Sequence, residues 1–199
     1  VGKVPGRSSE RVVLVGAHYD TKDIPGFVGA NDGASGTAVA LQLAREIEPR
    51  TIRPSLLFVF FDGEESPRGA ADHEFEEKGL RGSKVAARRY AGRVDQMVLL
   101  DFVGDKELAI PRERLSNAGL WRRLRAAARR TGFARHFPAR EQGAVLDDHV
   151  PFIRAGVPAI DLIDFDFACW HRPCDNLTAV SQGSLNAVGE TMVAFLADL

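Results

Sequence analysis

Four short and nearly continuous apolar runs constrain the fold more than any other feature of the chain. They are RVVLVGA (11–17), SLLFVFF (55–61), QMVLLDF (96–102) and VPAIDLI (157–163). Strands that are apolar on both sides are typical of a sheet that is covered on both faces. We therefore expect these runs to be strands in the middle layer of the molecule.

Segments with helical patterning separate the apolar runs. Residues 34–48 place apolar side chains at helical spacing, and Pro49 ends the segment. Further helices are expected over 83–93 and 120–131, and after Ser181 as an N-cap. Strands that alternate with helices predict an α/β sandwich with a largely parallel sheet.

The bulk properties exclude several classes of partner. The 199 residues are enough for one domain with a sizeable core. Lys+Arg and Asp+Glu number 26 and 27, so the charge balance does not indicate a nucleic-acid partner. No apolar run reaches the roughly 20 residues that a membrane span needs. Polar residues 67–79 are expected to form a surface insertion.

The start of the chain and its cysteines bear on localisation. The first residue is not Met. We expect a leader, or more of the domain, to have preceded it, so the N-terminus does not indicate the compartment. Cys169 and Cys174 lie five residues apart and flank Trp170 and His171. They can form a small disulfide loop, and two free buried thiols are the alternative. A bridge would favour a secreted or periplasmic protein.

An acidic stretch, FFDGEES (60–66), directly follows the second apolar run. Asp62, Glu64 and Glu65 repel one another there, so a cation, a shared proton or exposure to water must compensate. Ligands of open α/β sheets bind beyond the carboxyl ends of the strands. Further polar residues follow the other runs, namely His18, Asp20, Asp32, Asp101, Asp147, Asp148 and His171.

Each of these residues is a weak signal alone, but together they provide imidazole and carboxylate ligands of the kind that zinc binds. Such a cation would offset the repulsion within the acidic stretch. Only one of Glu64 and Glu65 need bind it, and the other can hold a water and shuttle its proton. Asp20 is expected to accept a hydrogen bond from His18 or to orient it, as partners of metal-binding imidazoles do.

Six motifs in this order resemble the zinc exopeptidases of the bacterial leucine aminopeptidase type, metallopeptidase family twenty-eight, whose sister group is the glutaminyl cyclases. They are GAHYDT, GANDGASG, FFDGEE, LLDFVG, DDHVPFIRAGVPA and WH-x-x-x-D, and the match runs from residue 11 to about residue 180. The resemblance implies one catalytic domain over residues 1–199, either shortened or trimmed before its first strand. It also implies a three-layer sandwich whose mixed, mostly parallel sheet has helices on both faces.

The resemblance implies roles for individual residues. The metal-ligand positions are His18, Asp32, Glu65, Asp101 and His171. In an aminopeptidase Asp32 would bridge two zinc ions, Glu64 would be the general base, and the substrate would be a peptide with a free N-terminus. The substrate pocket is expected to involve Trp170 and Phe165, with Phe152 either lining it or in the core, and Asp147 or Asp148 binding the substrate ammonium.

The aminopeptidase is the preferred interpretation, and a glutaminyl cyclase is the alternative. FFDGEE and the DDH motif look more like those of cyclases. There, one zinc is held at the positions of Asp32, Glu65 and His171. The acids at the positions of Asp101 and Asp147 form a hydrogen-bonded chain and do not bind metal. Asp161 stands where many animal cyclases carry a histidine. A non-catalytic binding domain is the third interpretation, which the complete ligand set argues against. The preferred N-terminal residue and the oligomeric state stay open.

Overall fold

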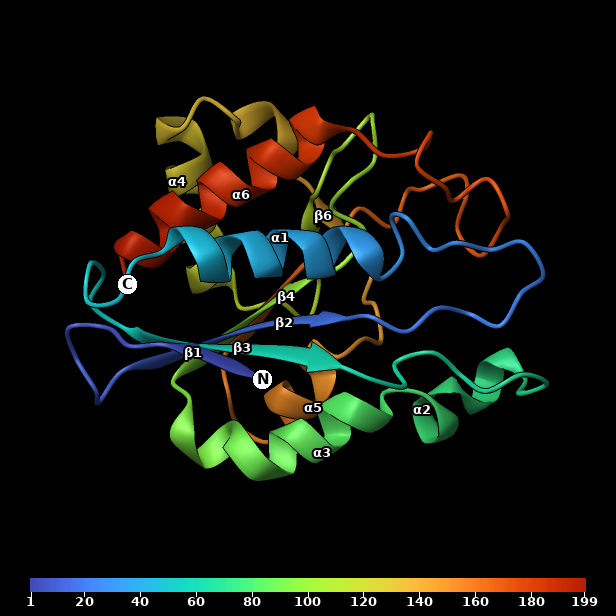
Figure 1. Ribbon diagram of the computed structural model, residues 1–199, viewed down its shortest axis with the longest axis horizontal. Coiled ribbons are helices and arrows are strands. Elements are labelled where there is room, and N and C mark those ends of the chain that lie inside the picture. Colours follow the sequence, from blue (N-terminus) through green and yellow to red (C-terminus); the bar gives the residue numbers. More distant parts are fainter.

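A five-stranded sheet forms the middle layer of the computed structural model, which describes residues 1–199 (Figure 1). Its strands are β1 (Gly2–Val4), β2 (Val12–His18), β3 (Ser55–Phe61), β4 (Gln96–Leu100) and β7 (Ala159–Leu162). They lie in the order β1-β3-β2-β4-β7, with β1 antiparallel to β3 and all other pairs parallel. The predicted mixed, mostly parallel sheet is confirmed.

All four predicted strands are present, but the edge strand β1 and a small second sheet were not expected. The second sheet pairs β5 (Arg112–Glu113) with β6 (Glu141–Gln142). Both additions are only two or three residues long, and two of the three residues of β1 are exposed. Strands this short carry no apolar run that a sequence pattern can reveal.

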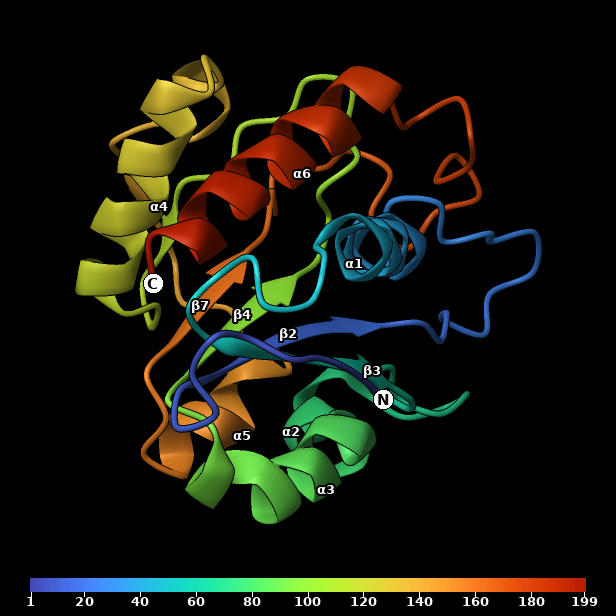
Figure 2. The ribbon, with the colours of Figure 1, turned by 60° about the vertical axis from the view of Figure 1, so that its left-hand side comes forward.

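Helices cover both faces of the sheet (Figures 1 and 2). On one face lie α1 (Ala34–Glu46), α4 (Ala118–Arg130) and α6 (Gln182–Ala197). On the other lie α3 (Arg81–Tyr90) and α5 (His149–Arg154), with the short α2 (Phe75–Lys78) beyond the end of β3. The expectation for residues 67–79 was therefore incomplete, since α2 and a 3₁₀ turn at Asp72–Glu74 lie within this segment.

The two faces of the sheet bury two separate apolar cores. The larger, of 29 residues, lies under α1, α4 and α6, and the smaller, of 11 residues, lies under α3 and α5. Because side chains alternate across a strand, Val13 and Val15 of β2 enter the larger core and Leu14 enters the smaller one. Burial on both faces explains why the strands read as continuous apolar runs. Ser181 caps α6 as predicted, with its hydroxyl accepting from Ser184 N at 3.0 Å.

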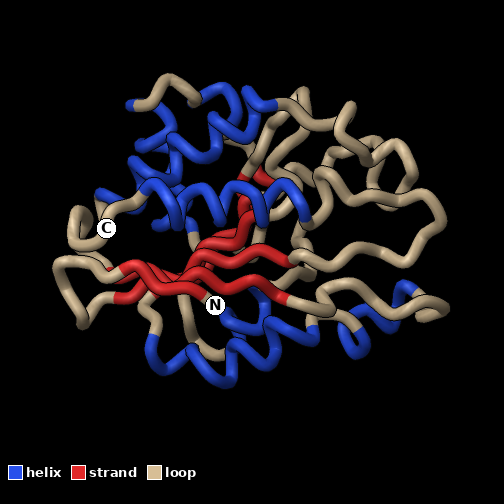
Figure 3. The backbone as a smooth tube through the Cα atoms, in the orientation of Figure 1, coloured by secondary structure: helices blue, strands red, loops and turns tan.

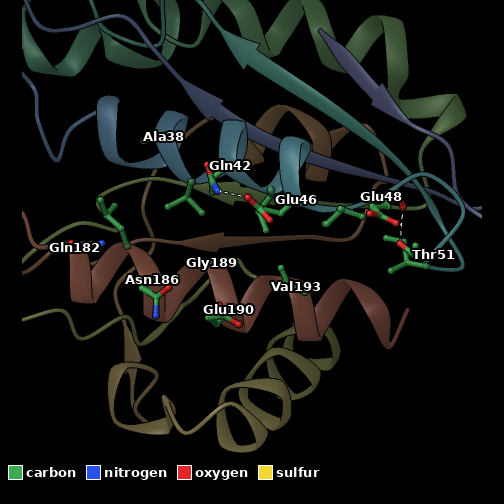
Figure 4. Close-up of a pocket in the computed structure, with 15 residues that line it drawn as sticks. Ala38, Gln42, Glu46, Glu48, Thr51, Gln182, Asn186, Gly189, Glu190 and Val193 are labelled. Carbon is green, nitrogen blue, oxygen red and sulfur yellow. Dashed lines mark hydrogen bonds between the residues drawn. The ribbon is translucent and has the colours of Figure 1, made fainter.

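A groove of about 790 Å³ runs between α1 and α6 (Figure 4). Its rim carries polar side chains, among them Gln42, which donates to Glu46 across 2.7 Å. None of the residues that line it belongs to the predicted site. None of the helices is both long and apolar enough to cross a bilayer.

The approach of α1 to the sheet depends on Gly36. A Cβ at this position would overlap the Leu100 carbonyl at the end of β4. We expect Gly36→Ala to lower the free energy of unfolding by about 1–3 kcal/mol, as overpacking typically does. Gly189→Ala in α6 is the matched control. Its Cβ meets no atom within 4 Å, so better helix propensity should raise stability by about 0.5–1 kcal/mol. Urea titration measures both, and equal stability of Gly36→Ala and the unmodified chain would contradict the packing described.

Candidate metal centre and active site

The parallel strands end and long loops begin at one edge of the sheet (Figures 1 and 3). The predicted ligand residues lie at this edge. This is the carboxyl edge, at which ligands bind in open α/β sheets. His18 is the last residue of β2, and Asp32 lies in the loop before α1. Residues 64 and 65 follow β3, Asp101 follows β4, and His171 lies in the loop after β7.

Asp32 lies at the centre of the site, between the two imidazoles. Its Oδ1 is 3.3 Å from His18 Nε2, and its Oδ2 is 3.5 Å from His171 Nε2. The same nitrogens lie 3.3 Å from Asp101 Oδ1 and 3.1 Å from Glu65 Oε1, respectively. Two groups of three ligands therefore share Asp32, and within each group the ligand atoms lie within 4.8 Å of one another.

The donor set fits a bound metal. Asp32 Oδ2 is buried and has no hydrogen-bond partner. Buried acceptors without partners are rare and costly, so a positive charge is expected beside this oxygen. One imidazole and two carboxylates, from His171, Asp32 and Glu65, are ligands that zinc binds. The acids at the strand ends would then be compensated by a cation.

Asp175 holds the backbone of Asp32 in place. This fully buried carboxylate accepts from Asn31 N at 2.7 Å and from Asp32 N at 3.0 Å. Gly33 follows with φ +87°, and a Cβ there would lie 2.9 Å from Asp20 O and 3.0 Å from the His18 ring. Only glycine fits this turn without strain, so the turn fixes the distance between Asp32 and His18.

The carboxylate of Asp20 orients the acidic turn and does not hold the His18 ring. Its carboxylate accepts from Glu64 N and Glu65 N, both at 3.1 Å. His18 Nδ1 instead lies 3.1 Å from the Asp20 backbone carbonyl, while the carboxylate is 3.7 Å away. The expected pairing of the two residues is therefore made through the carbonyl. The other ring nitrogen, Nε2, faces Asp32 and Asp101.

Glu64 and Glu65 are both buried but have opposite electrostatic surroundings, whereas Asp62 is exposed. Burial alone would raise the pKa of Glu65, but His171 and Lys22 lower it below its ordinary value, with Lys22 Nζ 3.0 Å from Oε2. For Glu64, burial and the nearby charges of Asp147 and Asp148 raise the pKa well above its ordinary value, against the opposing charge of His18. Glu65 is thus suited to bind a cation and Glu64 to transfer a proton.

A cleft of about 270 Å³ opens onto these residues, and Glu64, Asp101 and Asp147 lie along it. Trp170 and Phe165 form part of its wall, 46% and 41% exposed, with ring centroids 5.2 Å apart. Of the other predicted pocket residues, Phe152 is fully buried in the smaller core, and Asp148 is buried and does not line the cleft.

The loop that carries His171 is closed by a disulfide between Cys169 and Cys174. His171 has φ +51°, in the left-handed region that residues with a Cβ rarely adopt. Trp170 stacks on the His171 ring with centroids 4.6 Å apart. A constrained backbone at this position is typical of a functional site, because the surrounding structure must hold it there.

Two residues of the site were missed by sequence reasoning. Asp175 ends the WH-x-x-x-D motif but received no role, although its place in that motif was a signal. Lys22 is a single lysine in a polar loop and gave no signal. Its contact with Glu65 depends on the fold, which brings the loop after β2 next to the turn after β3.

Comparisons with known proteins relate the chain to a peptidase family and to glutaminyl-peptide cyclotransferases. Residues 1–196 match the model described as peptidase family M28. The glutaminyl-peptide cyclotransferase of Drosophila melanogaster is 30% identical over 210 residues, which cover 87% of this chain and 57% of that protein. The Bos taurus protein of the same name is 28% identical over 231 residues, covering 95% and 63%. The chain thus spans less than two thirds of the length of either relative.

Solved structures agree in fold. The Acidobacteriales bacterium glutaminyl cyclase matches with a TM-score of 0.87 and 31% identity, over 98% of this chain and 70% of that chain. A leucine aminopeptidase precursor from Bacteroides thetaiotaomicron matches with a TM-score of 0.89 and 25% identity, over 96% and 73%. The match along residues 1–196, with the α/β fold of these neighbours, shows that the chain belongs to peptidase family M28.

Proposed function

We propose that this chain carries the active site of a glutaminyl-peptide cyclotransferase, which closes an N-terminal glutamine into a ring and releases ammonia. This replaces the aminopeptidase as the preferred interpretation, and the relatives named for the cyclase activity support it. The geometric observation that carries the choice is the position of His18. Its Nε2 lies 3.3 Å from Asp32 Oδ1 and also 3.3 Å from Asp101 Oδ1, so a protonated imidazole can supply the positive charge on this side of Asp32.

The two sides of Asp32 differ in how their charge is balanced. Burial alone would lower the pKa of His18, but the carboxylates of Asp101, Asp20 and Asp32 raise it well above its ordinary value. A protonated His18 then supplies the positive charge on its own side. Burial also raises the pKa of Asp101 to about 7, against the opposing charge of His18, which makes Asp101 a weaker metal ligand near neutral pH. The proposal is therefore one ion, held by Asp32, Glu65 and His171, with His18 protonated beside it.

Ring closure needs a proton to leave the substrate's N-terminal amine and another to reach the departing ammonia. Glu64 lines the cleft beside the proposed ligands, and its raised pKa suits a group that accepts the first proton and donates the second near neutral pH. When bound, zinc would polarise the side-chain amide carbonyl of the substrate. Trp170 and Phe165 would contact the glutamine side chain from the open wall of the cleft.

The disulfide supports a location for this activity. Cys169 and Cys174 are bridged, and such bridges persist in oxidising compartments. A secreted or periplasmic location is therefore part of the proposal.

An aminopeptidase remains the second candidate, because His18, Asp32 and Asp101 form a group of ligand atoms as compact as that of Asp32, Glu65 and His171. A carboxylate shared between two such groups could bridge two ions, which in two-metal sites lie about 3.5–4 Å apart. The leucine aminopeptidase precursor from Bacteroides thetaiotaomicron shares the fold.

Substrate preference and zinc content together separate the two candidates. The purified chain is incubated with one peptide that starts with glutamine and one that starts with leucine, and bound zinc is counted by mass spectrometry. Zinc at the cleft is the difference between wild type and Asp32→Ala, which lacks the ligand shared by both cleft groups. We expect ammonia release from the glutamine peptide and a difference of about one zinc. Leucine release with about two zincs at the cleft would favour the aminopeptidase instead.

The role of Glu64 is tested by Glu64→Gln, which keeps the shape but cannot accept a proton. We expect kcat to fall by about 10²–10⁴-fold while zinc content stays unchanged. Asp62→Asn is the matched control in the same turn, since Asp62 is exposed and should be replaceable without loss. Turnover by Glu64→Gln at the rate of the control would remove Glu64 from the mechanism.

The role of Asp175 in holding Asp32 is tested by Asp175→Asn, which can accept only one of the two backbone amides well. We expect zinc affinity to weaken about 10–100-fold, the usual effect of losing a residue that orients a ligand. Competition with a zinc-binding dye measures this. Asp166→Asn, at an exposed position of the same loop, is the control. Equal zinc affinities of the two variants would show that Asp175 does not hold the site.

A further inference from the structure

A second cluster of buried polar side chains lies behind the cleft, and the proposed cyclisation does not use it. Glu113 of β5, His149 at the start of α5 and Asp161 of β7 are fully buried, and Asp147 is 3% exposed. Asp147 also lines the cleft, so the cluster and the cleft share one carboxylate. None of the four belongs to the ligand groups around Asp32.

Glu113 lies behind His149, beside its Nε2. The Glu113 carboxylate accepts from the backbone amides of Leu115 and Ser116, both at 2.8 Å, and of Val145 at 3.0 Å. These amides stabilise the carboxylate, and its Oε2 lies 3.3 Å from His149 Nε2.

The other nitrogen of His149, Nδ1, faces the acids. It lies 3.7 Å from Asp161 Oδ2, and neither ring nitrogen has a hydrogen-bond partner. Both oxygens of Asp161 and Oδ2 of Asp147 are likewise buried without a partner. Buried lone pairs that face one another without a partner repel, so a positive charge, carried by a metal ion or a proton, is expected among them.

We propose that Asp147, His149 and Asp161 form a second divalent-cation site, suited to zinc or a similar transition metal. Their ligand atoms lie within 4.8 Å of one another. Tetrahedral zinc at its usual bond lengths places ligand atoms about 3.3 Å apart, close to the 3.7 Å between His149 and Asp161. Two carboxylates neutralise a divalent ion, and a carboxylate behind the imidazole, as Glu113 is, accompanies most histidine ligands.

The site would act through structure rather than through chemistry on the substrate. Its ligands come from the loop before α5, from α5 itself and from β7, so an ion there ties this helix to the last strand. It would also fix Asp147, which forms part of the cleft and offers an entry path for the ion. The inference uses none of the proposed cleft ligands and goes beyond the proposed function.

Metal counting tests the site without reference to activity. The full chain is equilibrated with zinc, dialysed and measured by mass spectrometry as wild type, Asp161→Asn and Asp148→Asn. We expect Asp161→Asn to hold one zinc fewer per chain than wild type. Asp148→Asn, the control, should hold as many as wild type, because Asp148 is equally buried but outside the ligand group. Equal zinc content in Asp161→Asn and wild type would overturn the proposal and indicate that Asp147 and Asp161 share a proton instead.

Circular dichroism shows whether Asp161→Asn folds. If it does not, a second measurement, on the wild-type chain, tests the site. An anomalous map at the zinc edge from wild-type crystals should place an ion about 2.0–2.1 Å from His149 Nδ1. A map with no ion there overturns the proposal. His171→Ala separates this result from the cleft, because it should lose the cleft zinc and leave the ion at His149 in place.

Discussion

The site depends on the two hydrogen bonds by which Asp175 holds the backbone at Asn31 and Asp32. They place the Asp32 carboxylate between imidazoles that come from opposite ends of the sequence, His18 and His171. They tie the loop before α1 to the loop after β7. The left-handed Gly33 completes the constraint, since no larger residue fits against Asp20 and His18 there.

The molecule compensates its buried and half-buried acids in three different ways. Asp20, Asp175 and Glu113 are each bound by two or more backbone amides, which stabilise a carboxylate without a cation. Glu65 is paired with Lys22 and His171. Asp32, Asp147, Asp148 and Asp161 retain buried oxygens with no partner, and all of them except Asp148 belong to a proposed metal site. Buried acids therefore differ in function according to their partners.

The sequence predicted the sheet and the edge at which function gathers, because continuous apolar runs report burial on both faces and acids at their ends stand out. His18, Asp32 and Asp101 could be named for that reason. Residues whose roles come from contacts distant in sequence could not be assigned. Lys22 reaches Glu65 across 43 positions and Asp175 reaches Asp32 across 143, and neither pairing leaves a local pattern. The preference between one and two ions likewise depends on the contacts of His18 with Asp32 and Asp101, which lie far from it in sequence.

The central claim is that Asp32, Glu65 and His171 hold a single cation while His18 carries a proton. Locating zinc by anomalous scattering in crystals of the chain tests it most directly. The account predicts, at the cleft, one ion about 2.0–2.2 Å from Asp32 Oδ2, Glu65 and His171 Nε2, with no ion bound to His18. An ion coordinated by His18 and Asp101, or no ion at His171, would contradict it.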